Sequence, residues 1–174
     1  NHQLLADKID AVTIAASTSA HFELARFFLG NGIHVLVEKP MTTTSQEGTT
    51  LTELADKHGL KLQVGHVERF NPALLTAKKR LGTVQFIECH RLAPFKHRSA
   101  EVNVVLDLMI HDLDVILSLV DGKPTKVSAV GIRVLTSSVD IANARIEFDT
   151  GAVANVTSSR VSPNTQRKFR VFQH

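Results

Sequence analysis

The first third of the chain alternates short apolar runs with segments in which apolar residues recur at helical spacing. Three of these runs are short enough to be strands buried in a parallel sheet, and they span residues 10–16, 33–37 and 60–64. Strands that alternate with helices over short connections run parallel and are joined by right-handed crossovers. The pattern therefore predicts the second half of a doubly wound Rossmann sheet.

Capping residues support the two intervening helices. The triplet 17–19 (Ser-Thr-Ser) offers N-caps for a helix over residues 20–29. Thr44 is followed three residues later by Glu47, which is a capping-box pattern, and Gly59 ends the helix that it opens. Both helices are therefore expected to lie between the predicted strands.

The pattern changes between residues 66 and 71. Asn71 and Pro72 form a cap and first-turn pair for a helix that runs to about residue 81. The expected elements that follow are a strand, a long helix and four further strands, over residues 83–92, 103–120, 126–135, 141–148, 152–160 and 167–172. We therefore predict an α/β protein with Rossmann residues 1–68 and an α+β domain over 69–174, which we expect to be incomplete at its C-terminus.

Residues 141–148 alternate strictly between apolar and polar. One side carries Ala142, Ala144, Ile146 and Phe148, while the other carries polar residues such as Arg145. This alternation is typical of an antiparallel sheet with one covered face. The predicted second domain therefore has a largely antiparallel sheet.

Bulk composition excludes several functions. The net charge is only +3, and the one basic cluster, Lys78-Lys79-Arg80, fits the solvated face of a helix, so we expect no nucleic-acid partner. No apolar run is long enough to span a membrane, and no signal peptide is visible, so we expect no membrane association. The single cysteine, Cys89, lies in a strand-like run and is expected to be a buried, inert thiol, which fits a cytoplasmic location.

The expected ligand edge of the Rossmann half is polar, but a key motif is missing. In such sheets ligands bind beyond the carboxyl ends of the strands. A dinucleotide site also needs a Gly-rich turn before a helix, and the sequence contains no G-x-G-x-x-G, since Gly30 and Gly32 close a helix. Either the chain binds no dinucleotide, or the half that grips the adenosine lies upstream; the polar strand ends favour the second alternative.

Four motifs, in register with the predicted elements, resemble the glucose-fructose oxidoreductase/inositol dehydrogenase (Gfo/Idh/MocA) family. They are the E-K-P sequence at 38–40, the turn at 17–21 (STSAH), the segment at 65–72 (GHVERFNP) and the D-x-x-x-H pattern of Asp107 and His111. The sequences of residues 69–74 and 90–95 are similar to those of family members that oxidise the 3-hydroxyl of UDP-N-acetylglucosamine. The resemblance implies an oxidoreductase that transfers a hydride from a sugar or sugar-nucleotide hydroxyl to NAD or NADP.

The resemblance also implies roles for individual residues. The catalytic residues would be Lys39, Asp107 and His111. Contacts to the cofactor would come from the first two loops, namely from Ser17, Thr18, His21, Glu38, Lys39 and Pro40, and contacts to the substrate from Arg69, Asn71 and Asp107. No metal is expected, because His66, His90 and His97 lack ligand spacing. Homodimers or homotetramers built on the late sheet are also implied.

The proposed chemistry suits these residue types. Oxidation of an alcohol needs a base with a pKa near the working pH, which histidine provides. Asp107 lies four residues before His111, on the same face of a helix, and could orient the imidazole or bind a sugar hydroxyl. The ammonium group of Lys39 could stabilise a forming alkoxide. Pro40 is expected to fix the turn, with a cis bond as one way of doing so.

Each assignment has a structural alternative. His111 lies near an apolar stripe that includes Leu106, Ile110 and Leu117, so it could be an interior histidine, and Asp112 and Asp114 are expected on the solvent side of the helix or as caps. The 17–21 turn could be a plain cap, and the 38–39 pair or Arg69 a surface ion pair. At the level of the protein, the alternatives are a catalytically silent family member that senses a sugar or binds a partner, and a purely structural domain.

Overall fold

The computed structural model describes residues 2–96 and 102–174, and these form two compact units. The division falls between His66 and Val67, two residues before the boundary that the sequence predicts. A parallel sheet in the first unit and a largely antiparallel sheet in the second confirm the predicted α/β fold class.

The first unit is a three-stranded parallel sheet with the order β1-β2-β3. In chain order, its elements are the 3₁₀ helix η1 (His2–Leu5), β1 (Ala11–Ile14), α1 (Thr18–Gly30), β2 (His34–Val37), α2 (Ser45–Lys57) and β3 (Leu62–Val64). Each strand is followed by a helix or by the connection to the second unit. The carboxyl ends of all three strands therefore meet at one edge of the sheet.

One face of this sheet holds the core of the first unit. Phe28 and Leu29 of α1 and Leu51 of α2 are buried against Val35 and Val37 of the central strand. Burying one such side chain contributes about 1.5–3 kcal/mol. Residues 10–16 were expected to form a buried strand, and this holds for one face of β1 only. Ile14 is buried, whereas Ala11 and Thr13 on the other face are exposed, because the described helices pack on the Ile14 side.

The predicted capping box is confirmed. The Thr44 hydroxyl accepts a hydrogen bond from the Glu47 amide at 3.2 Å, and the Glu47 carboxylate accepts one from the Thr44 amide at 3.2 Å. These bonds satisfy amides that a helix start leaves without partners. The helix ends before Gly59, whose φ of 63° lies in the left-handed region that favours glycine.

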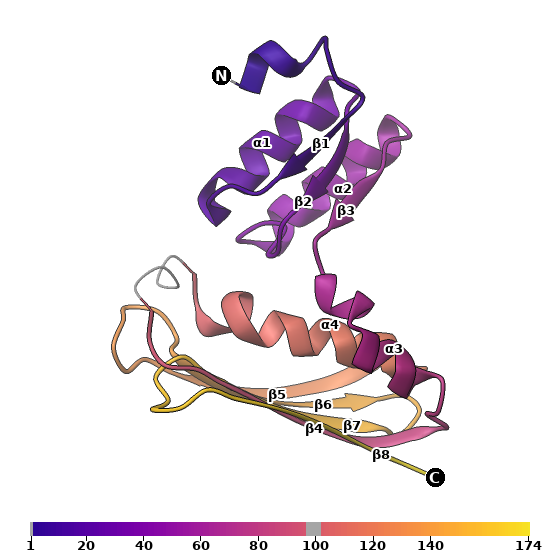
Figure 1. The fold of residues 1–174 in the computed structure, drawn as a ribbon, viewed down its shortest axis with the longest axis vertical. Coiled ribbons are helices and arrows are strands. Elements are labelled where there is room, and N and C mark those ends of the chain that lie inside the picture. Colours follow the sequence, from indigo (N-terminus) through magenta and orange to yellow (C-terminus); the bar gives the residue numbers. More distant parts are fainter. Residues whose placement is uncertain (1, 97–101) are drawn as a thin grey trace. The chain divides into compact units, whose positions relative to one another are not determined.

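The second unit places helices over one face of a five-stranded sheet with the order β5-β6-β7-β4-β8 (Figure 1). Its elements are η2 (Val67–Phe70), α3 (Pro72–Lys78), β4 (Val84–Leu92), the π-helical η4 (Val105–Met109), α4 (Ile110–Leu119), β5 (Pro124–Ile132), β6 (Ile141–Phe148), β7 (Val153–Ser159) and β8 (Gln166–Gln173). In the described part of this sheet, β4 and β7 pair in parallel and the other neighbours are antiparallel.

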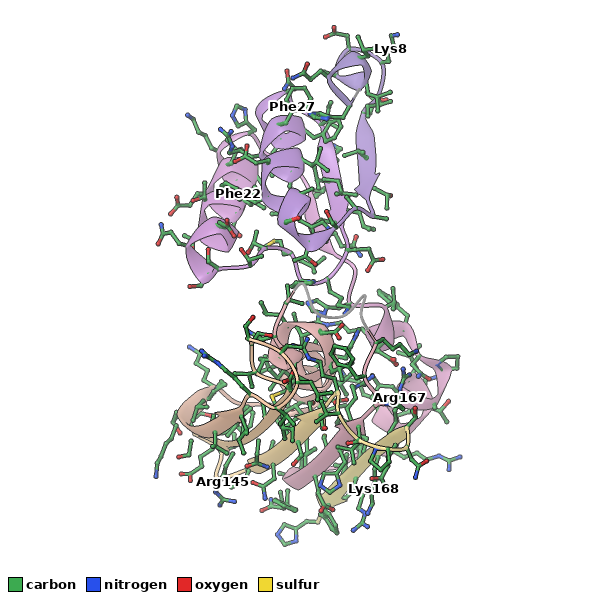
Figure 2. The ribbon with its side chains drawn as sticks, turned by 90° about the vertical axis from the view of Figure 1, so that its left-hand side faces the viewer. Lys8, Phe22, Phe27, Arg145, Arg167 and Lys168 are labelled. Carbon is green, nitrogen blue, oxygen red and sulfur yellow. The ribbon has the colours of Figure 1, made fainter. Side chains whose placement is uncertain are left out.

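The predicted alternation in β6 is confirmed. The four apolar side chains, from Ala142 to Phe148, are buried against the helices, together with Ile87 and Cys89 of β4. Burial raises the pKa of the Cys89 thiol, so the thiol stays protonated and inert. Arg145 extends from the opposite, exposed side of the sheet (Figure 2).

A buried ion pair lies beside the loop between β5 and β6. The Asp140 carboxylate accepts hydrogen bonds from Arg160 Nε at 2.8 Å and from the amides of Val134, Leu135 and Thr136 at 2.7–2.9 Å. Burial alone would raise the pKa of Asp140. The amide hydrogen bonds and the arginine outweigh burial and hold the pKa of this carboxyl well below its ordinary value. Asp140 is therefore ionised in the folded protein.

We expect Asp140→Asn to lower the free energy of unfolding of the second unit by about 3–5 kcal/mol, because the buried guanidinium of Arg160 loses the negative charge of the Asp140 carboxylate. The depressed pKa means that the carboxylate stabilises the fold above the unfolded pKa of about 3.9 and that this contribution is lost as the pH falls further. Urea unfolding at pH 7 and pH 3 measures both effects. The matched control, Asp121→Asn, changes an exposed aspartate, and an equal effect of both substitutions would contradict this account.

Candidate functional site

The loop after β1 leads directly into α1. Ser17 occupies the N-cap position, but its side chain makes no capping hydrogen bond; its hydroxyl lies 3.3 Å from that of Ser19. Ser17 is exposed and Thr18 is half-buried. The described contacts thus do not use the Ser17 side chain as a helix cap, and its contact with a cofactor stays a prediction.

The E-K-P sequence follows β2 at the same edge of the sheet. Its proline is buried and the bond between Lys39 and Pro40 is cis, which the sequence left open. Glu38 packs against Gly65 after β3, since a Cβ on that glycine would lie only 3.1 Å from the carboxylate. Lys39 and Glu38 are both half-buried. They therefore do not form the fully exposed ion pair that was the alternative to a role in the site.

His21 joins the two loops. Its imidazole is 1% exposed, with Nδ1 2.8 Å from the Pro40 carbonyl oxygen and Nε2 3.1 Å from that of Ala16. Both contacts are to main-chain atoms at the carboxyl ends of β1 and β2. The sequence predicted direct contact of His21 with a cofactor. No pattern in the sequence indicates the two contacts to carbonyl oxygens.

The long helix of the second unit begins as a π-helix. The Asn103 side chain accepts hydrogen bonds from the amides of Val105 and Leu106 at 3.0 and 3.1 Å. Asp107 lies in the π-helical turn and His111 follows in the first turn of α4, and both are half-buried. A π-helical turn was not predicted; such turns are frequent at functional sites, where they change the direction of side chains.

Two carboxylates that the sequence placed on the solvent side are buried, which corrects that expectation. Asp112 accepts hydrogen bonds from Arg91 of β4 at 2.9 and 2.7 Å, and Asp114 accepts them from Arg69 of η2 at 2.8 and 2.7 Å. Leu117, which was assigned to the apolar side, is instead 51% exposed. The arginines decide this arrangement, because a paired carboxylate can be buried at far lower cost than a lone one.

The two predicted substrate ligands outside α4 both have local partners. Arg69 forms the bidentate pair with Asp114, as in the ion-pair alternative. Asn71 caps α3 by accepting a hydrogen bond from the Ala73 amide at 3.0 Å, and it donates one to Glu68 at 3.1 Å. Contact of either residue with a substrate stays a prediction.

Glu68 is a charged residue near His111 that is not among the site residues predicted from the sequence. The hydrogen bond from Asn71 lowers the pKa of Glu68 despite the opposing effect of burial. Electrostatic interactions with Arg91, His111 and Arg167 lower this pKa further. Glu68 is therefore held as a carboxylate within electrostatic reach of the predicted base.

A half-open cavity of about 480 Å³ lies within the second unit, on the helix side of the sheet. Polar residues at its wall include Glu68, Arg91 and Arg167, while apolar side chains come from α3, α4 and β8. Its volume falls in the range of small-molecule pockets. Sequence periodicity could not reveal this cavity, because its wall combines residues of η2, α3, β4, α4 and β8, most of which are distant in sequence.

Neither metal ligands nor a membrane span emerge from the described parts of the chain. Among residues 2–96 and 102–174, no three His, Cys, Asp or Glu side chains are grouped as metal ligands, and His97 lies outside these residues. None of the described helices is long and apolar enough to cross a membrane.

Comparisons with known proteins identify the class. Residues 1–66 match an oxidoreductase family with an NAD-binding Rossmann fold, and residues 74–173 match the Gfo/Idh/MocA C-terminal domain. The chain therefore belongs to the Gfo/Idh/MocA family, as its motifs predicted.

Individual relatives narrow the comparison. The chain is 41% identical to a UDP-N-acetylglucosamine 3-dehydrogenase of Acidithiobacillus ferrooxidans, over 97% of this chain and 54% of that protein. It is 33% identical to the scyllo-inositol 2-dehydrogenase (NAD(+)) of Bacillus subtilis, over 89% and 50%. A solved structure of the Acidithiobacillus ferrooxidans enzyme superimposes with a TM-score of 0.92 and 38% identity, over 99% of this chain and 57% of that one. The chain thus spans about half the length of these relatives.

We expect the Arg69–Asp114 pair to be energetically coupled. In a double-mutant cycle of Arg69→Ala and Asp114→Asn, the coupling in the free energy of unfolding should be about 0.5–3 kcal/mol, because the carboxylate is only 9% exposed. The control cycle uses the exposed pair Arg26 and Glu23, for which about 0.3–0.5 kcal/mol is expected. Equal coupling in the two cycles would show that burial adds nothing to the Arg69 pair.

Proposed function

We propose that this chain is part of an NAD(P)-dependent dehydrogenase that oxidises a hydroxyl of a sugar nucleotide, with the 3-hydroxyl of UDP-N-acetylglucosamine as the preferred substrate. The observation that carries the proposal is the 41% identity to a UDP-N-acetylglucosamine 3-dehydrogenase over nearly the whole chain. Lys39 after β2 and the Asp107–His111 pair at the start of α4 supply residues suited to this chemistry. We propose a cytoplasmic location for the enzyme, in keeping with its single buried thiol.

The residues present fit one end of the cofactor. Gly65 leaves space for the Glu38 carboxylate at the carboxyl edge of the sheet, and Ser17 is exposed at the start of α1. In the proposal, Glu38, Lys39, Pro40, Ser17 and the neighbouring Thr18 bind the nicotinamide end. The sequence has no Gly-rich phosphate turn, so these residues do not by themselves provide a pyrophosphate site.

Three side chains divide the chemistry. The bound nicotinamide would accept the hydride. His111 would take the hydroxyl proton as general base, with Asp107 orienting its imidazole or binding a neighbouring hydroxyl. The Lys39 ammonium would stabilise the negative charge that develops on the sugar oxygen. The two residues act on the same carbinol group. The base removes the hydroxyl proton, and the cation stabilises the charge on the oxygen while the hydride leaves the carbon.

We expect His111→Ala, in the protein encoded by the complete open reading frame, to lower kcat for UDP-N-acetylglucosamine about 10²–10⁴-fold, the usual contribution of general base catalysis. Formation of NADH or NADPH, followed at 340 nm, measures the rate. The matched control is His58→Ala, which removes an exposed histidine at the end of α2.

Two outcomes would contradict the proposal in different ways. Full activity of the His111 variant would exclude His111 as the base but leave the reaction intact. Absence of turnover by the unaltered protein with any sugar nucleotide, combined with tight binding of NAD or of the sugar nucleotide, would favour the catalytically silent alternative.

We also propose that the enzyme forms homodimers or homotetramers through the open face of the second sheet. This face is largely polar, with Asn143 donating a hydrogen bond to Thr157 at 2.9 Å and Arg145 to Asn155 at 3.4 Å. At its edge, β5 adds the exposed side chain of Val130. Paired polar groups with apolar residues beside them suit contact with a second copy.

We expect Val130→Asp to shift the assembly toward monomers, because a charge would be buried without a partner in the interface. Val130 pairs with Asn143 on the open face, whereas Val127 of the same strand pairs with Ile146 on the helix side, and both valines are about 60% exposed. Val127→Asp is therefore the matched control. Sedimentation velocity measures the result, and equal dissociation of both variants would contradict assembly through the open face.

A further inference from the structure

His21 has no side-chain nitrogen available for a ligand. The residue is 1% exposed, and each ring nitrogen already lies within 3.1 Å of a main-chain carbonyl oxygen. A carbonyl oxygen only accepts hydrogen bonds, so a neutral imidazole can donate to one of the two and a protonated imidazole to both. In either state, both polar atoms of the side chain point at the protein.

The two carbonyl groups belong to different loops of the ligand edge. Ala16 lies between β1 and α1, and Pro40 lies between β2 and α2. The imidazole is therefore a brace between the first loop and the second. His21 is carried by α1, and Phe28 and Leu29 of the same helix are buried in the core of the first unit. Their packing fixes the position of the helix and therefore of the imidazole.

The contact to Pro40 completes the support of the E-K-P backbone. On the strand side, the Glu38 amide donates a hydrogen bond to the Ile14 carbonyl at 2.9 Å. On the far side, His21 contacts the Pro40 carbonyl at 2.8 Å. Lys39 lies between these two points, so its main chain is held from both neighbours.

We propose that His21 is a positioning residue for Lys39 and not a ligand of the cofactor. This inference rests on the proposed function, in which the ammonium group of Lys39 acts on the reacting oxygen. Misplacing a catalytic group by about 1 Å can cost about 100-fold in rate. Loss of the brace should therefore reduce kcat, while the groups that touch the cofactor remain in place.

A direct test uses the chain itself without cofactor. Reductive methylation with ¹³C-formaldehyde labels the lysines, and the Lys39 signal is identified by its absence in Lys39→Arg. We expect His21→Gln to shift or broaden the Lys39 signal, whereas His58→Gln, at an exposed histidine in the same unit, should leave it unchanged. An unchanged Lys39 signal in folded His21→Gln would overturn the proposal.

A kinetic test uses the protein from the complete open reading frame. His21→Gln should lower kcat about 10- to 100-fold and leave the Kd for NAD within about two-fold. In a Lys39→Met background, the same substitution should cause no further loss, because its effect passes through Lys39. A raised Kd for NAD with a persistent loss in the Lys39→Met background would instead identify His21 as a cofactor ligand.

Two further measurements keep the outcomes distinct. If circular dichroism shows that His21→Gln does not fold, His21→Asn, which keeps a short side-chain donor, replaces it in both tests. Full activity of Lys39→Met alone would overturn the proposed role of Lys39, but the ¹³C signal would still report whether His21 supports the loop. Failure of the proposed function and failure of this inference therefore give different results.

Discussion

The second unit depends on one constraint, which is that a carboxylate can leave water only beside a cation or several donors. Asp112, Asp114 and Asp140 are all buried, and each forms a short pair with an arginine. Two of these pairs tie α4 to β4 and to η2, and α4 is the helix that carries His111. Ionic contacts of this kind define the helix rotation more narrowly than apolar packing does, because two parallel hydrogen bonds fix the orientation as well as the distance.

In the first unit, contacts to neutral main-chain groups fix the backbone that carries the proposed catalytic residue. Its parallel strands all terminate at one edge, where the chain must turn and where carbonyl groups would otherwise lack donors. His21 serves two such carbonyl groups, from Ala16 and Pro40, and Gly65 leaves space for the carboxylate of Glu38. In both units, the residues proposed for catalysis therefore lie on backbone that is supported by neighbours outside the reaction.

Local signals predicted the elements well. The capping box at Thr44 located α2, the Asn71–Pro72 pair located α3, and strict alternation in residues 141–148 identified both faces of β6. These signals succeed because they depend on residues a few positions apart. The π-helical turn at 105–109 was missed, because the apolar residues of 103–120 were assigned to faces with α-helical spacing throughout.

The sequence by itself determined the order of strands and helices, the family, and the candidate residues Lys39, Asp107 and His111, because periodicity, caps and short motifs are written in neighbouring residues. Only the tertiary structure decided which polar residues are engaged within the protein. Arg69 and Asp114 are 45 positions apart, and His21 reaches Pro40 across 19. No local pattern encodes such a partner, since it depends on how separate elements pack, and that packing turned an expected surface aspartate into a buried ion pair.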